Sequence, residues 1–266
     1  MTSLPLFLVT GAVAGLLAGL FGVGGGLIMV PALAALLPRV GVAESVIMQM
    51  AIGTSLAVIS ATSISSMLAH HRRGGVLWPV FLRFAPGLAL GALAGAWAAH
   101  LLPGIALRRI VGGGALIVAL QMALDARPAA SDDGDAGGPA TLALLAAGSV
   151  IGALSSLVGI GGGSLTVPYL TWCRIGMRQA VGTAAACGVP IAWAGAIGFI
   201  VAGWDVPGRP AGSLGYVSTS GFLGLAGASV LCAPLGARLA HRLPPKLLKR
   251  AFALLIAGIG VGMLVR

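Results

Sequence analysis

The residues of this chain that could bind a ligand gather in two glycine-rich segments. These are GVGGGLIMVP at residues 22–31 and GIGGGSLTVP at residues 159–168, which share four glycines, a valine and a proline at matching positions. Glycine costs about 1 kcal/mol relative to alanine inside a helix, so three in succession favour a break. A helix that resumes after such a run presents free N–H groups, which attract anions. The sequence therefore predicts two backbone elements suited to an anion.

Polar side chains near these runs could complete such a site. The candidate substrate-binding residues are Gly24, Gly25, Gly26, Gln49, Thr54, Ser55, Gly161, Gly162, Gly163, Ser164 and Thr183. Thr54 and Thr183 occupy equivalent positions, because each follows a glycine in the segments AIGTSLA and AVGTAAA. The polar side chains of this set donate hydrogen bonds, and none is an acid that would repel an anion. Two simpler explanations stay open: the glycines serve close helix crossing, and the hydroxyls bond to their own backbone.

The composition places these segments in a membrane. Of 266 residues, 58% are hydrophobic and 8% are charged, whereas soluble proteins have about 25% charged residues. Apolar stretches of about 18 residues or more predict membrane spans. They occur at residues 5–37, 46–69, 76–99, 105–124, 141–171, 180–202 and 216–239, and we count the shorter stretch at 251–265 with them. We therefore expect an all-α integral membrane protein with no room for a soluble catalytic domain. The basic residues behind the net charge of +10 lie in short loops, so nucleic acid is not an expected partner.

The duplication extends over both halves of the chain. Gly11 and Gly15 match Gly148 and Gly152 at one constant spacing. We expect a first transmembrane repeat at residues 1–124, a polar linker at 125–139 and a second repeat at 140–266, with about four spans in each repeat. Residues 5–37 would form a helix of about 50 Å, which exceeds the hydrocarbon core of about 30 Å. A glycine-broken or re-entrant helix should therefore open each half, and we favour inverted over parallel repeats.

Basic residues in the loops predict the orientation. If each half crosses four times, ten Lys and Arg residues share one side and five share the other. If the glycine element turns the chain back, Arg39, Arg108 and Arg109 exchange sides with Arg72, Arg73 and Arg127, and the ratio is unchanged. The richer side is expected in the cytoplasm. Both topologies therefore place the two termini in the periplasm, and the charges do not choose between them.

The two glycine motifs, the Gly-Thr pair that follows each of them and the two halves joined by a polar linker resemble the sulfite exporter TauE/SafE family of membrane permeases. This resemblance covers essentially the whole chain. It implies a secondary transporter or permease for small sulfur-containing anions or carboxylates, such as sulfite or organosulfonates, in a bacterial inner membrane. The second half carries Ser164 where the first has Leu27, so the two halves need not bind solute alike.

The expected function is thus secondary transport of a small anion by alternating access around two broken helices, without enzymatic activity, cofactor or metal. An intramembrane protease would need a Ser–His or Asp–Asp pair at membrane depth, and the four histidines lie at span ends. The alternatives are a membrane subunit of an ATP-driven permease, for which no GxxxxGK[ST] motif is present, and a non-transporting membrane assembly protein. The expected partners are the anionic solute and membrane lipids. The solute, the transport direction, proton coupling and homo-oligomerisation stay open.

Overall fold

The part of the chain that the structure describes is helical. The computed structural model describes residues 4–21, 25–123, 140–240 and 245–265, and within these ranges it contains ten α-helices and no strand. Before the linker lie α1 (Leu4–Phe21), α2 (Gly26–Leu36), α3 (Ile47–Arg72), α4 (Trp78–Leu101) and α5 (Gly104–Ala123). After it lie α6 (Thr141–Val158), α7 (Gly163–Trp172), α8 (Met177–Ala202), α9 (Thr219–Ala240) and α10 (Pro245–Val265). The prediction of an all-α protein is confirmed for these ranges.

Membrane-spanning capacity is unevenly distributed among these helices. Five segments of the described ranges are long and apolar enough to cross a bilayer, namely Glu44–Arg72, Trp78–Leu101, Gly104–Ala123, Thr141–Val158 and Met177–Ala202. The segments Pro5–Leu17, Gly26–Val40, Thr219–Cys232 and Arg250–Val265 are shorter apolar helices. The predicted continuous stretches 5–37 and 141–171 are therefore each divided into two helices. The stretch predicted at 216–239 begins slightly later, because α9 starts at Thr219.

Both predicted breaks are present at the glycine runs. In the first, α1 ends at Phe21, residues 22–24 lie outside the described ranges, and Gly25 has a positive φ of 74° before α2 begins. In the second, α6 ends at Val158, and the next residue, Gly159, has a left-handed φ of 73° and an N–H that donates to the Ser155 carbonyl. Ile160 N–H donates to the same carbonyl at 2.9 Å. A left-handed glycine that satisfies the last carbonyls is a common helix terminator, so the second break follows directly from the sequence.

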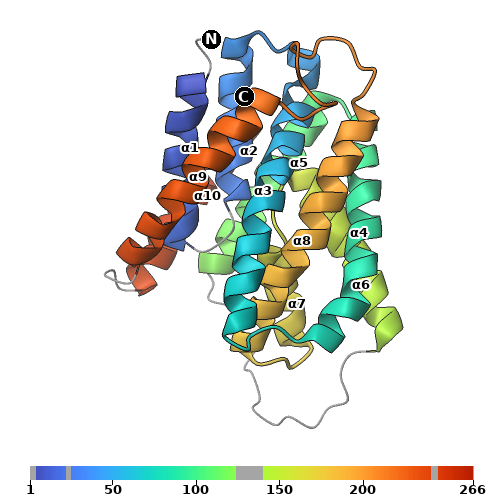
Figure 1. Ribbon diagram of the computed structural model, residues 1–266, viewed down its shortest axis with the longest axis vertical. Helices are drawn as coiled ribbons and strands as arrows, with labels where there is room; N and C mark the ends of the chain where they lie inside the picture. The colour runs from blue at the N-terminus through green and yellow to red at the C-terminus, as the bar shows by residue number, and fades with distance from the viewer. Residues whose placement is uncertain (1–3, 22–24, 124–139, 241–244, 266) are drawn as a thin grey trace.

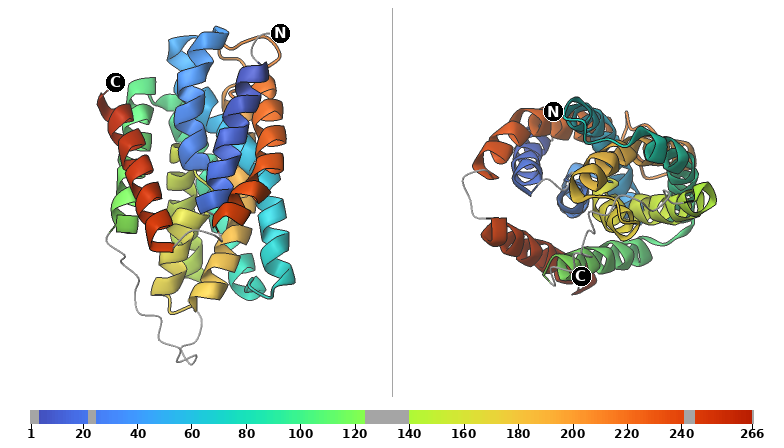
Figure 2. Two further views of the ribbon diagram at one scale, coloured as in Figure 1. Left: turned by 90° about the vertical axis from the view of Figure 1, so that its left-hand side faces the viewer. Right: turned by 90° about the horizontal axis from the view of Figure 1, so that it is seen from below.

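The helices before the linker run opposite to their counterparts after it. Figure 1 shows α1 and α3 descending from the end where the N-terminus lies, whereas α6 and α8 ascend from the other end. The short helix α2 ascends and α7 descends. Both chain ends lie near the same end of the molecule in Figures 1 and 2. Each helical hairpin formed around a glycine run thus enters from one end and returns toward it.

Helices that precede the linker pack against helices that follow it. Gly11 and Gly15 of α1 lie against the backbone of α9, and the matching Gly148 and Gly152 of α6 lie against α4. The absence of side chains at such rows allows close helix contact. α3 and α8 pack against each other, and every residue of α3 from Ile47 to Ile59 is buried. α3 therefore forms the core against which the two broken helices are placed.

Candidate functional site

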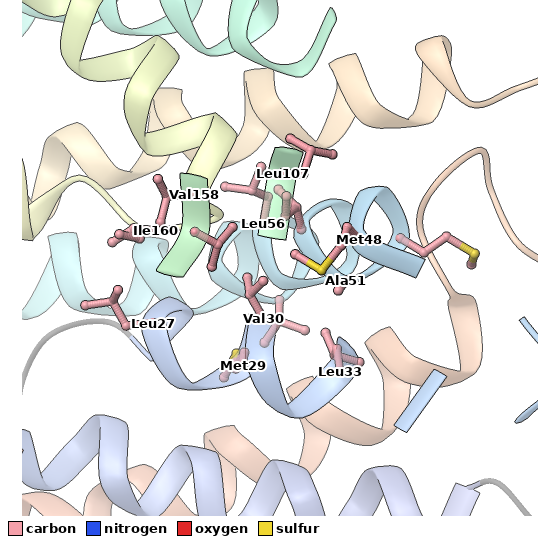
Figure 3. Packing of buried hydrophobic residues seen from close by; sticks show 14 of the residues in the cluster. Leu27, Met29, Val30, Leu33, Met48, Ala51, Leu56, Leu107, Val158 and Ile160 are labelled. Carbon is pink, nitrogen blue, oxygen red and sulfur yellow. The ribbon is translucent and has the colours of Figure 1, made fainter. Parts of the chain in front are cut away.

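The two glycine breaks meet in the middle of the molecule. A Cβ on Gly26, the first residue of α2, would overlap the carbonyl oxygen of Gly159 and would lie 3.0 Å from Cα of Ile160. On the other side, a Cβ on Gly159 would lie 2.5 Å from Cγ2 of Val30. Figure 3 shows Leu27 and Val30 of α2 facing Ile160 and Val158 at the second break. These contacts require glycine at both positions, and they bring the broken segments into direct contact.

A buried serine of α3 joins this crossing. Ser55 Oγ donates a hydrogen bond of 3.2 Å to the Gly159 carbonyl, and Ser55 is fully buried. The Gly159 carbonyl lies beyond the last turn of α6, where carbonyls lack helical partners. The neighbouring Ile59 fills space beside both breaks, because its side chain approaches Gly26 and Gly161. Two predicted site residues, Ser55 and Gly26, are therefore brought together at the Gly159 carbonyl.

The first break is closed by aliphatic side chains. Leu27 is 3% exposed, Met29 is 2% exposed and Val30 is fully buried, and all three belong to the main hydrophobic core. Figure 3 shows them packed beside Leu33 and opposite Leu56 of α3. All the residues from Gly25 to Val30 are buried. The first turn of α2 is consequently inaccessible to a solute in this conformation.

Four buried hydroxyl groups that have no partner in the described ranges flank the second break in the chain. Ser164 Oγ and Thr166 Oγ1, both in the first turns of α7, are buried atoms without a hydrogen-bond partner among the described residues. Ser155 Oγ and Ser156 Oγ, in the last turn of α6, share this property. Gly163 is partly exposed, and no heavy atom lies within 4 Å of the place where its Cβ would be. The second break is thus the more polar and the more open of the two.

Gly162 places α7 against α8. A Cβ on Gly162 would lie 3.0 Å from the backbone nitrogen of Gly188 and 3.1 Å from Cδ1 of Ile191. Gly162 is also the N-cap residue of α7, and no side chain of the described residues caps the N–H groups of the first turn. Its carbonyl accepts the Thr166 N–H at 3.0 Å. The N–H groups of the first turn therefore lack a side-chain partner.

Thr54 and Thr183 have matching partners in the opposite half. Thr54 Oγ1 of α3 accepts the Ser218 N–H at 2.9 Å, and Thr183 Oγ1 of α8 accepts the Leu77 N–H at 3.0 Å. Both threonines are fully buried. Ser218 directly precedes α9, and Leu77 directly precedes α4. We refer to these as the Thr54 contact and the Thr183 contact, and each connects a central helix to a loop of the other half.

The glycine before each threonine leaves room for the loop that this threonine binds. A Cβ on Gly53 would lie 2.9 Å from the Tyr216 carbonyl oxygen, and one on Gly182 would overlap the carbonyl of Gly75. Tyr216 and Gly75 each lie two residues before their contact residue. The Gly-Thr pair therefore works as a unit, in which glycine admits the loop and threonine accepts a hydrogen bond from it. The loops lie at opposite ends of the molecule in Figure 1, the one before α9 at the end that carries both termini.

Tyr216 fixes the loop before α9 further. Tyr216 is 2% exposed, and its hydroxyl lies 3.0 Å from Nδ1 of His100 at the end of α4. Its ring contacts the ring of Phe199 edge-on at a centroid distance of 6.3 Å. Burial raises the pKa of Tyr216, against a lowering effect of nearby Arg209, so the phenol stays protonated around neutral pH. The Thr54 contact is therefore supported by an aromatic anchor.

The structure gathers most, but not all, of the predicted site residues. Gly25, Gly26, Ser55, Gly161, Gly162, Gly163 and Ser164 lie at or beside the two breaks. Gly24 lies outside the described residues. Gln49 is 4% exposed and its Nε2 donates to the Leu102 carbonyl at 3.0 Å, toward the loop between α4 and α5. The predicted site did not include Gly159, although its carbonyl is the acceptor at the crossing. It did not include Thr166 either, although this residue is one of the polar residues that directly follow the second glycine run.

The buried polar groups of the described residues are uncharged. They are the side chains of serines, threonines and one glutamine, and the hydroxyl of Tyr216. Arg83 and Glu44, which lie within or at the start of predicted spans, are exposed. Within the described ranges no three His, Cys, Asp or Glu side chains are grouped to hold a metal ion. The arrangement can therefore offer neutral hydrogen-bond donors and helix-terminal N–H groups to a ligand.

Comparison with known proteins agrees with this architecture. Residues 7–263 match the model of the family described as sulfite exporter TauE/SafE. The chain is 38% identical over 266 residues to a "Probable membrane transporter protein" of Haemophilus influenzae, covering all of this chain and 99% of that protein. It is 26% identical over 270 residues to a protein of the same description from Methanocaldococcus jannaschii, covering 98% and 96% of the two chains. No solved structure matches the chain. The chain therefore belongs to the sulfite exporter TauE/SafE family and is a multi-pass membrane transporter.

Proposed function

We propose that this protein is a secondary transporter of small anions, with sulfur oxyanions such as sulfite and organosulfonates as the first candidates. The observation that carries this proposal is the crossing of the two glycine breaks at Gly26 and Gly159. Irregular backbone at membrane depth is tolerated where it is buried in protein or lines a cavity. Broken helices at corresponding points of two repeats characterise the binding sites of secondary transporters. The family name and the uncharged donors of the site support an anionic solute.

We infer that the two halves form an inverted repeat, each with five membrane-entering helices. The opposite directions of α1 and α6, and of α3 and α8, support this arrangement. With these directions, Arg72, Arg73, Arg174 and Arg178 lie toward the end opposite both termini, and so does the start of α10, which carries Lys246, Lys249 and Arg250. The positive-inside rule assigns this end to the cytoplasm. Both termini would then face the periplasm of a bacterial inner membrane.

The pairing of the two threonine contacts supports a mechanism of alternating access. The Thr54 contact lies toward the end with both termini, and the Thr183 contact lies toward the other end. Each is one hydrogen bond between halves, with a net value of about 0.5–1.5 kcal/mol. Bonds of this size can break and re-form during a transport cycle. In the proposed cycle, one contact opens while the other stays closed, and the solute reaches the breaks from one side at a time.

Transport by the purified full-length protein tests the proposal. Proteoliposomes are loaded with sulfite, sulfate, isethionate or acetate, and efflux is compared with that of protein-free liposomes. We expect saturable flux of at least one sulfur anion without ATP. A protonophore should slow any concentrative flux that is coupled to protons. Strict dependence on an added ATPase would instead support the subunit of an ATP-driven permease, and absence of flux for every anion would favour the assembly protein.

A further inference from the structure

Buried hydroxyls without partners are concentrated at one of the two breaks. Among the described residues, five buried side-chain atoms have no hydrogen-bond partner, and four of them are the hydroxyls of Ser155, Ser156, Ser164 and Thr166. These four residues lie within about one helical turn of the second break. The large majority of buried side-chain polar atoms in proteins have a hydrogen-bond partner. Ser156 Oγ faces α8, because a Cβ on Gly195 would lie 3.2 Å from it. The hydroxyls of Ser164 and Thr166 belong to the first turns of α7, and a ligand from outside the chain can supply the partner that they lack in the described part of the chain.

The first break has no such groups. Alignment of the two glycine motifs places Ala18, Gly19, Leu27 and Met29 opposite the four hydroxyl residues. None of these side chains offers a hydrogen-bond donor. Leu27 and Met29 are instead part of the main hydrophobic core. The hydroxyls are therefore specific to the second half and are not required by a broken helix as such.

Thr166 lies in the first turns of α7, three residues after the partly exposed Gly163. Its N–H bonds to the carbonyl of the N-cap Gly162, so the residue stands one turn inside the helix. Helical side chains lean toward the N-terminus of their helix, which directs the Thr166 hydroxyl toward the uncapped N–H groups. Thr166 is fully buried, whereas the adjacent Gly163 is partly exposed and has no neighbouring atom where a Cβ would stand. The first turn of α7 thus combines a partly exposed glycine, N–H donors and a buried hydroxyl without a partner among the described residues.

We propose that the first turn of α7 is the solute site of this transporter and that the first turn of α2 is not. The N–H groups at Gly163 and Ser164, with the hydroxyls of Ser164 and Thr166, hold a small oxyanion through neutral donors. This inference rests on the proposed function and restricts it to one of the two breaks. Helix N-termini bind oxyanions through their partial positive charge and free N–H groups. A solute with several acceptor oxygens, such as sulfite or sulfate, suits this donor set, and a cation does not.

Thr166→Val tests the site, because valine keeps the branched shape and removes the hydroxyl. Affinities for sulfite and sulfate are measured by calorimetry on the purified full-length protein, together with its Tm without ligand. We expect about tenfold weaker binding, from the loss of one hydrogen bond to a charged ligand. The Tm without ligand should be unchanged or raised, since a buried hydroxyl without a partner is removed. Thr166→Ser should retain the affinity of the original protein.

Thr171→Val is the matched control in the same helix. Thr171 is also buried, but its hydroxyl already donates to the carbonyls of Val167 and Pro168 at 3.1 and 2.9 Å. Its replacement should leave the affinity unchanged, and so should Met29→Leu at the first break. Equal affinity of Thr166→Val and the original protein would overturn the α7 site, as would a Thr166→Val protein that fails to fold while Thr166→Ser folds. Absence of binding and transport in the original protein would instead overturn the proposed function itself.

Discussion

We predict that loss of one threonine contact loosens the loop at its own end of the molecule and leaves the loop at the other end unchanged. Thr54→Val keeps the side-chain shape but leaves the buried Ser218 N–H without its acceptor, and Thr183→Val does the same to the Leu77 N–H. An unsatisfied buried donor costs about 1–3 kcal/mol. At about 1.4 kcal/mol per factor of ten, opening of the affected loop should become about 5- to 150-fold more frequent. The other loop should open as before.

Cysteine labelling measures this opening. Val217 and Val76 are equivalent buried residues, 4% and 9% exposed, and each adjoins a contact residue. Val217→Cys and Val76→Cys are introduced singly after the native cysteines have been replaced by alanine. Thr54→Val should accelerate maleimide labelling at position 217 and not at 76. Thr183→Val should have the reverse effect.

The matched controls are Thr54→Ser and Thr183→Ser, which keep the acceptor and should label at the original rates. Labelling that rises equally at both positions in either valine variant would mean that the contacts stabilise the whole fold. Unchanged labelling in both variants would mean that neither contact holds its loop. Either result would refute the assignment of one contact to each end.

Two further predictions follow from the breaks and from the orientation. Gly26→Ala should prevent correct folding, because its Cβ would meet the Gly159 carbonyl, whereas Gly163→Ala should fold, because no atom lies within 4 Å of its Cβ position. Size-exclusion chromatography and Tm compare the two variants. A stable Gly26→Ala protein would contradict the contact between the two breaks. A C-terminal alkaline phosphatase fusion should be active, and a cysteine near Arg39 should react from outside the cell, because α2 returns to the end that carries both termini. An active C-terminal green fluorescent protein fusion, or labelling near Arg39 only from inside, would reverse the orientation or the topology.

The sequence predicted the breaks because their cause is local. Three glycines in an apolar stretch disfavour a helix wherever the rest of the chain lies, and the same pattern occurs at residues 22–31 and 159–168. The equivalence of Thr54 and Thr183 was also visible in the repeated Gly-Thr pair. Their partners were not, because Ser218 and Leu77 contribute backbone N–H groups, which carry no residue-specific pattern. The two threonines were predicted as solute donors, and the structure shows that each accepts a hydrogen bond from the opposite half.

The crossing of the breaks could not be predicted for a related reason. Similarity between two segments indicates a shared conformation, but it says nothing about which segments touch. The contact of Gly26 with the Gly159 carbonyl depends on how the halves pack. Thr166 follows the second glycine run but was left out of the predicted site, because a threonine among apolar residues is commonly bonded within its helix. Only the absence of a partner for its hydroxyl among the described residues distinguishes it from Thr171.

The reciprocal packing of α1 on α9 and of α6 on α4 bears on how such a chain arises. When a surface of one unit contacts a second surface of its partner, and the partner returns the same contact, the arrangement is that of an isologous dimer. Two separate copies of one half could have made these contacts before the linker joined them. Identical copies would have to carry the same residues at both breaks. Fusion into one chain removes that constraint, so one copy can keep Leu27 and Met29 for packing while the other acquires Ser164 and Thr166.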